Sequence, residues 1–172
     1  ITTIELVGIP EPSEGWTLTM EGEIVDTITQ AYFEEALTCI HTTTWTDGDG
    51  NVWSGIPLWV LAGAVDDIET SSHWTCNDTL ASSGYTIRVM AGDGYNRTFS
   101  SSDVAHSGNY LVANVKNGQP LSGNEAPLRL VGTSATGGKS IGNIATIRLE
   151  GLPGYPEGDW DLLLEGAIRD TI

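Results

Sequence analysis

Cys39 and His41 are the residues of this chain whose types and spacing are best suited to chemistry. They lie two positions apart in LTCIHTTTWT, so a strand would place both side chains on one face. A thiolate and an imidazole can ligate a metal ion, although two ligands without a third do not define a metal site. A buried thiol, or a disulfide between Cys39 and Cys76, accounts for the same residue and is the favoured interpretation. His73 and His106 have no partner evident in the sequence and are interpreted as surface residues.

A second candidate is a cluster of oxygen ligands, since Asp47, Asp49 and Asn51 alternate in DGDGN as at the start of a calcium loop. The helix-loop-helix type needs glycine and glutamate at its sixth and twelfth positions, where this chain has Val52 and Leu58. The same residues suit the tight turn of a hairpin, which is the favoured interpretation. The alternative is a looser calcium site completed by one of three further carboxylates: Asp66, Asp67 or Glu69.

Charge narrows the classes of partner. The 172 residues carry 23 acidic and 7 basic side chains, for a net charge of −16. This balance argues against nucleic acid and against an anionic membrane as partners, and without eighteen consecutive apolar residues we expect no membrane insertion. Two glycosylation sequons, NDT at Asn77 and NRT at Asn96, lie in polar, turn-rich surroundings. Together with the acidity they favour an extracellular or cell-surface location.

The elements that must position these residues are short strands and a few short helices, which predicts an α+β fold. Alternation in residues 16–24 predicts a strand, and Thr29 suits the N-cap of a helix over 30–36. A hairpin is expected from Leu37 onward, followed by a helix that begins at Pro57 and continues to residue 67, where Asp66 and Asp67 would form a solvated end. Asn77 would cap a helix over 78–83 that Gly84 ends. Further strands are expected in five segments: YTIRVMA, YNRTFS, YLVANVKNG, APLRLVG and IATIRLEG.

An internal repeat sets the expected domain organisation. Residues 4–28, IELVGIPEPSEGWTLTMEGEIVDTI, return as residues 147–172, IRLEGLPGYPEGDWDLLLEGAIRDTI, and the final EGEIVDTI and EGAIRDTI agree at six of eight positions. We expect one module over 1–149, with 150–172 forming the first strands of a second repeat or a swapped or donated strand. An unpaired apolar strand must find a sheet edge, on its own domain or on another copy. The alternative is that both copies are similar edge hairpins of a single sandwich.

Five stretches in their order resemble the molybdopterin-binding domain of the sulfite oxidase superfamily, over residues 16–149: DGDGNVWSGIPLWVLAG, GYTIRVMAGDGYNRTFSSSDV, YLVANVKNGQPL, APLRLVG and GKSIGNIATIRL. The chain looks most similar to divergent copies in archaeal and bacterial cell-surface proteins. The resemblance implies a mostly β, sandwich-like α+β fold with short helices. In it Gly55 would supply a turn that no side chain permits and Pro57 would start the helix, while Trp53 and Trp59 would be core or wall residues.

The resemblance also implies a cofactor site. In catalytic members a cysteine on the strand before this helix ligates molybdenum, and Cys39 occupies a comparable place. The pterin phosphate normally needs several cations, whereas the seven basic residues here are scattered. GTSATGGKSIGN, with Lys139, is the best candidate anion cradle, although such loops are more often plain turns. We therefore expect no cofactor, with molybdopterin held by Cys39 and Lys139, or calcium, as the alternatives.

These observations lead to one expected function and one alternative. The first is a non-catalytic extracellular module, structural or adhesive, in a repeated cell-surface or filament-forming protein. It would associate with copies of itself or with neighbouring repeats by strand addition. The alternative is a molybdopterin-dependent oxidoreductase domain in which Cys39 is the metal ligand.

Overall fold

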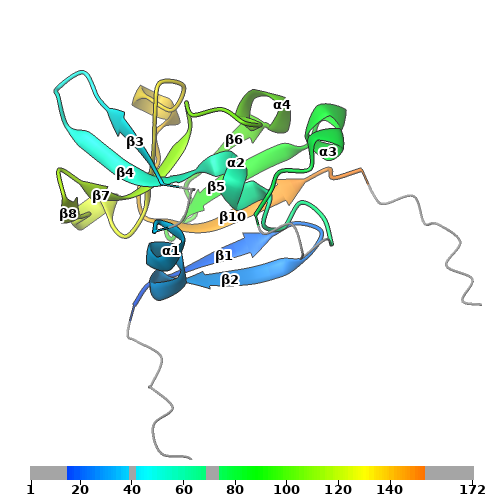
Figure 1. The fold of residues 1–172 in the computed structure, drawn as a ribbon, viewed down its shortest axis with the longest axis horizontal. Coiled ribbons are helices and arrows are strands. Elements are labelled where there is room, and N and C mark those ends of the chain that lie inside the picture. The colour runs from blue at the N-terminus through cyan, green and yellow to red at the C-terminus, as the bar shows by residue number, and fades with distance from the viewer. Residues whose placement is uncertain (1–14, 39–41, 69–73, 154–172) are drawn as a thin grey trace, which may run out of the picture.

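Two sheets joined by short helices make up the part of the chain that the structure describes (Figure 1). The structure is a computed structural model and describes residues 15–38, 42–68 and 74–153. No helix among these residues is both long enough and apolar enough to span a bilayer.

The first sheet has the strand order β2-β1-β10-β5-β6. β1 and β10, which lie at opposite ends of the described chain, pair in parallel, and the other pairs are antiparallel. The bounds are β1 Thr17–Glu21, β2 Val25–Thr29, β5 Thr86–Ala91, β6 Asn96–Ser100 and β10 Ile144–Glu150.

The second sheet is antiparallel and has the order β3-β4-β7-β8, with β9 also paired to β7. Its bounds are β3 Thr43–Thr46, β4 Val52–Pro57, β7 Leu111–Lys116, β8 Gln119–Pro120 and β9 Arg129–Val131.

The helices are short, and their ends follow the capping residues of the sequence. The Thr29 hydroxyl accepts a hydrogen bond from the Tyr32 amide at the start of α1, and the Asn77 side chain accepts one from the Leu80 amide at the start of α3. Gly84, with φ +87°, follows α3. The bounds are α1 Gln30–Ala36, α2 Leu58–Ala62, α3 Asp78–Ser83, α4 Ser101–Val104, and the 3₁₀ turns η2 Gly123–Glu125 and η3 Gly137–Lys139.

The main core is shared by both sheets. Leu18 of β1 and Ile147 of β10 are fully buried in the same cluster as Ile56 of β4 and Val112 of β7. Burial of each such side chain stabilises the fold by about 1.5–3 kcal/mol. A smaller cluster contains Trp53, which is 4 % exposed, and lies on the opposite face of the second sheet. Strand alternation gives this separation, since Leu111 and Ala113 belong to the small cluster and Val112 between them to the main one.

Three sequence-based expectations about local structure are wrong. Leu37 is the C-cap of α1, and it and Thr38 lie in a turn where a strand was expected, while β3 covers Thr43–Thr46. Pro57 is the N-cap of α2, as expected, but the helix ends at Ala62, and turns replace its expected continuation to residue 67. Gly55 is required by a close approach: its φ is ordinary, but a Cβ there would lie 2.0 Å from the carbonyl oxygen of Val112 on β7.

The internal repeat coincides with strands that are neighbours in the first sheet. Residues 147–150, the last four of β10, match residues 4–7 in sequence. Residues 16–28, which contain β1 and most of β2, match residues 160–172. In each copy, a segment rich in proline and glycine lies between these two matched parts: residues 8–15 in the first copy and residues 151–159 in the second. The sequence of the last strand of the module is therefore followed by a sequence that matches its first strands.

Candidate functional site

Several residues singled out from the sequence lie outside the described part of the chain: Cys39, His41, Glu69 and His73. Cys76 is half-buried, and the predicted disulfide with Cys39 cannot be placed because Cys39 lies outside the described residues. As a thiol, Cys76 is unreactive, because burial, reinforced by the charges of Asp66 and Asp78, raises its pKa to about 12. A protonated thiol is a weak nucleophile and a weak metal ligand.

The DGDGN stretch forms the tight turn between β3 and β4, and the Asp47 carboxylate lies at its centre. Its oxygens accept hydrogen bonds from the Asp49 amide at 3.0 Å, from the Asn51 amide at 2.9 Å and from the Trp53 indole at 3.0 Å. The Trp53 and Asn51 side chains contribute most to holding the Asp47 pKa at about 2. The hairpin interpretation accounts for these contacts, and the calcium site stays a prediction.

Asp66, interpreted from the sequence as part of a solvated helix end, is instead buried, with 1 % of its surface exposed. One carboxyl oxygen accepts a hydrogen bond from the Asn77 amide at 2.8 Å, and the other has no partner in the described part of the chain. Burial, with a smaller contribution from the charge of Asp67, raises the pKa of Asp66 to about 6. Across the described ranges, no three His, Cys, Asp or Glu side chains come together as a metal site.

Both sequon asparagines are half-buried and take part in the fold. The Asn77 amide nitrogen donates to Asp67 at 2.8 Å while its oxygen caps α3. The Asn96 side chain accepts from Arg88 at 2.8 Å and donates to the Gly94 carbonyl at 3.2 Å. Glycosylation at either position stays a prediction, and a glycan would be attached to the amide nitrogen that donates to Asp67 in Asn77 and to the Gly94 carbonyl in Asn96.

His106 and the two tryptophans serve the structure. His106 contacts the carboxylate of Asp78 at the start of α3, and its ring lies 4.8 Å from that of Trp59. Trp59 is partly buried against the main core, and Trp53 belongs to the smaller one. Both tryptophans therefore have the core or wall role expected from the sequence.

The described cations are largely engaged by the protein itself. Lys139 is the exception: it is exposed at the end of η3. All the others have acidic, carbonyl or aromatic partners: Arg88 with Glu150, Arg148 with Glu21, Lys116 and Arg129 with Glu125, and Arg97 with the Gly138 carbonyl and the Tyr95 ring.

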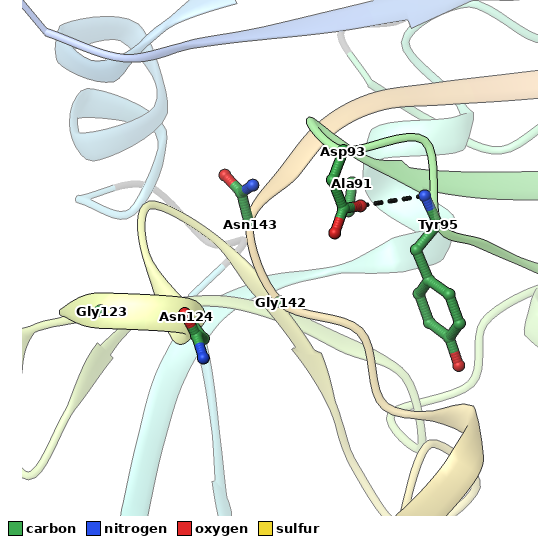
Figure 2. A pocket seen from close by; sticks show the side chains of 7 residues that line it. All are labelled: Ala91, Asp93, Tyr95, Gly123, Asn124, Gly142 and Asn143. Atoms are coloured by element: carbon green, nitrogen blue, oxygen red, sulfur yellow. Dashed lines mark hydrogen bonds between the residues drawn. The ribbon is translucent and has the colours of Figure 1, made fainter.

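One pocket between described residues has a volume of about 520 Å³ and is built from loops. Figure 2 shows that its lining comes from three separate segments: the β5–β6 turn, η2 and the residues just before β10. We call it the loop pocket, and its residues are Ala91, Asp93, Tyr95, Gly123, Asn124, Gly142 and Asn143. It therefore presents one carboxylate, two amides and a phenol, with no cation.

The walls of the loop pocket are held close together by the backbone. A Cβ at Gly142 would lie 2.3 Å from the Asn124 carbonyl oxygen, so only glycine permits this contact. The Gly92 amide donates to the Asn143 carbonyl at 2.9 Å, which ties the β5–β6 turn to the start of β10. Gly142 and Asn143 belong to GTSATGGKSIGN, the stretch that the sequence suggested as an anion cradle. The other lining residues could not be predicted, because they lie in AGDGYN and SGNE, which have the composition of ordinary turns.

Two smaller pockets also lie between described residues. One, of about 330 Å³, lies beside the Asp47 turn and includes Trp45 and Arg129. The other, of about 270 Å³, is lined by α1, β7 and the loop before β9, and includes Asn114. Asn114 is 6 % exposed, and its side-chain oxygen, itself inaccessible to solvent, has no partner within the described residues.

Comparison with known proteins shows a likeness in fold. No protein-family model matches the chain, and no curated protein sequence matches it. Among solved structures, the sulfane dehydrogenase SoxCD from Paracoccus pantotrophus is similar, with a TM-score of 0.55 and 19 % sequence identity. The match covers 83 % of this chain and 40 % of that one, so the chain spans about two fifths of the matched protein's length. The α+β fold, distantly similar to the sulfite-oxidase type, is thereby confirmed.

Proposed function

We propose that this chain is a non-catalytic module, structural or adhesive, of a repeated protein at the cell surface or in a filament. The observation that carries the proposal is the donor set of the loop pocket, which holds Asp93 and no cation. A sulfite-oxidase-like fold would then serve as a scaffold for contacts instead of as a holder of a redox cofactor.

The loop pocket does not fit a phosphorylated pterin. Phosphate recognition in proteins depends on arginine, lysine or clustered backbone amides, and a carboxylate in the same pocket repels the anion. Arg97 is a described cation that contacts a lining residue, and the Tyr95 ring and the Gly138 carbonyl engage its guanidinium. Lys139 is not among the lining residues. A net charge of −16 adds to the repulsion.

The alternative proposal is a molybdopterin-dependent oxidoreductase domain, and the likeness to a sulfane dehydrogenase is the observation that favours it. When bound, molybdopterin supplies two-electron redox chemistry at its metal. Cys39 would be the metal ligand and Lys139 the partner of the phosphate. The described residues around the loop pocket do not suit this group, so we rank this function second.

Assembly through strand addition is supported by the sheet edges. β2 and β6 form the edges of the first sheet and β3 one edge of the second, and Val25 of β2 is 74 % exposed. An edge strand presents main-chain donors and acceptors that another strand can pair with. The repeated sequence over residues 160–172 would supply such a strand to a neighbouring copy. The acidic surface and the sequons at Asn77 and Asn96 support an extracellular location.

Sedimentation of the full chain tests this assembly. Leu162 matches Leu18, which is fully buried in β1, and Leu163 matches the half-buried Thr19. We expect the native chain to associate as its concentration rises, and Leu162→Asp to abolish this association because a charge cannot replace a core leucine. Leu163→Asp adds the same charge one position away and should still associate. A native chain that stays monomeric at all concentrations would refute strand addition.

A further inference from the structure

The polar side chains of the loop pocket lead to a more specific inference about what the module contacts. We propose that the loop pocket binds neutral sugar residues of a glycan. This inference rests on the adhesive function proposed above and names its ligand class.

The first argument is chemical complementarity. Sugar hydroxyls donate and accept hydrogen bonds, and amide side chains offer both functions, whereas a carboxylate accepts. Asn124 and Asn143 are exposed, and their side chains form no hydrogen bond to another residue that the structure describes. Asp93 uses one carboxyl oxygen to accept from the Tyr95 amide at 3.0 Å, which leaves its second oxygen for a ligand.

An aromatic ring completes the donor set. Tyr95 is 45 % exposed at the pocket wall, so a ligand in the pocket can reach it from solvent. The C–H face of a pyranose is apolar and can cover such a ring while its hydroxyls reach the surrounding polar groups. The Arg97 guanidinium lies over one face of this ring, 4.2 Å from its centroid, so a sugar would cover the opposite face.

Charge excludes other ligand classes. An anionic ligand would face the carboxylate of Asp93 with no cation among the lining residues, on a chain of net charge −16. A metal ion would have a single carboxylate and neutral amides, which is a poor donor set for calcium. A neutral, hydroxyl-rich ligand brings no negative charge toward Asp93 and needs no further carboxylates, so it meets neither obstacle.

The backbone of the pocket is already ordered for binding. Two contacts join all three wall segments: Gly142 lies against the Asn124 carbonyl, and the Gly92 amide donates to the Asn143 carbonyl. A site that is held in place loses less entropy on binding. A volume of about 520 Å³ accommodates one or two sugar rings.

Binding is tested by saturation-transfer NMR on the full chain with a series of monosaccharides that differ in charge. The neutral probes are the methyl glycosides of glucose, galactose and mannose, the anionic probe is methyl glucuronide, and the cationic probe is glucosamine. We expect at least one neutral probe to bind and the glucuronide to bind roughly tenfold more weakly, since its carboxylate meets Asp93.

Two variants locate the site, and one controls for the backbone. Tyr95→Ala removes the ring, and Asn143→Gly removes an amide at φ +52°, where glycine keeps the backbone unstrained. Each should raise the dissociation constant by roughly fivefold to tenfold. Asn117→Gly makes the same change at the same φ in the β7–β8 turn, outside the pocket, and should leave binding unchanged.

Three results would overturn the inference: no glycoside binds, glucosamine binds more tightly than every neutral probe, or both pocket variants bind as the native chain does. Circular dichroism identifies a variant that has unfolded, and Asn143→Gly then decides, because it preserves the backbone. A chain that associates in sedimentation but binds no sugar would refute this inference alone and leave the proposed function standing.

Discussion

Asp66 is the residue whose environment departs furthest from its sequence context. It follows an apolar run and precedes another aspartate, a pattern typical of the solvated end of a helix. Its burial arises from tertiary structure, because the helix stops at Ala62 and the following turns carry Asp66 to the amide of Asn77. No local signal predicts this contact, since the two residues belong to different segments.

The burial of Asp66 makes stability depend on pH. Because its folded-state pKa of about 6 lies above the ordinary pKa of an aspartate, 3.8, protonation of Asp66 favours the folded chain. The stabilisation that comes from protonated Asp66 is fully present below pH 3.8 and is lost as the pH rises through about 6. This loss lowers the free energy of unfolding by roughly 2–3 kcal/mol. We therefore expect Asp66→Asn to unfold at higher urea concentration than the native chain at pH 7, with a smaller difference at pH 4.

Urea unfolding at several pH values between 4 and 8 measures this effect. Asp26→Asn, at an exposed position on β2, removes the same unit of charge and separates the effect of net charge from that of burial. An Asp66→Asn curve parallel to that of the native chain throughout this range would contradict the assignment.

At the scale of elements, the sequence predicts best where a local signal determines the structure. The caps at Thr29 and Asn77, the β3–β4 hairpin and most strands are confirmed. β2 was missed because only Ile28 of its five residues is buried, which leaves no alternating pattern. The requirement for Gly55 was assigned to the wrong cause, since the approach of β7 involves residues that lie far along the chain.

The β3–β4 hairpin provides a test between the two interpretations of DGDGN. Asp47→Ala removes the acceptor of the Asn51 and Trp53 hydrogen bonds, so it should lower the melting temperature by the same amount with calcium and with a chelator. Asp49→Ala keeps the amide that donates to Asp47 and should have little effect. A native chain that melts at a higher temperature in calcium, by an increment lost in both variants, would establish the calcium site instead.

At the scale of the whole molecule, the α+β fold could be predicted from ordered motifs, but the pairing of its ends could not. β1 and β10 are parallel neighbours, although most of the described chain separates them. The repeat shows that β10 is followed in sequence by a second version of β1 and β2. A tandem array in which each module closes with its own β10 accounts for this order.

The loop pocket also belongs to this scale, because three segments build it and only the one that ends in Gly142 and Asn143 was singled out from the sequence. Sequence reasoning identified Cys39 and Lys139 by analogy with a family, whereas the described structure brings together Asp93, Asn124 and Asn143. The family resemblance therefore predicted the fold. It did not predict the polar side chains of the loop pocket, because tertiary contacts bring them together.

The central claim is that this scaffold works without a pterin cofactor. Its most direct test is elemental and cofactor analysis of the full chain, purified from a host that makes molybdopterin. We expect far less than one molybdenum or tungsten atom per chain and no extractable pterin, for the native chain and for Cys39→Ser alike. One metal atom and one pterin per native chain, both lost in Cys39→Ser, would contradict it.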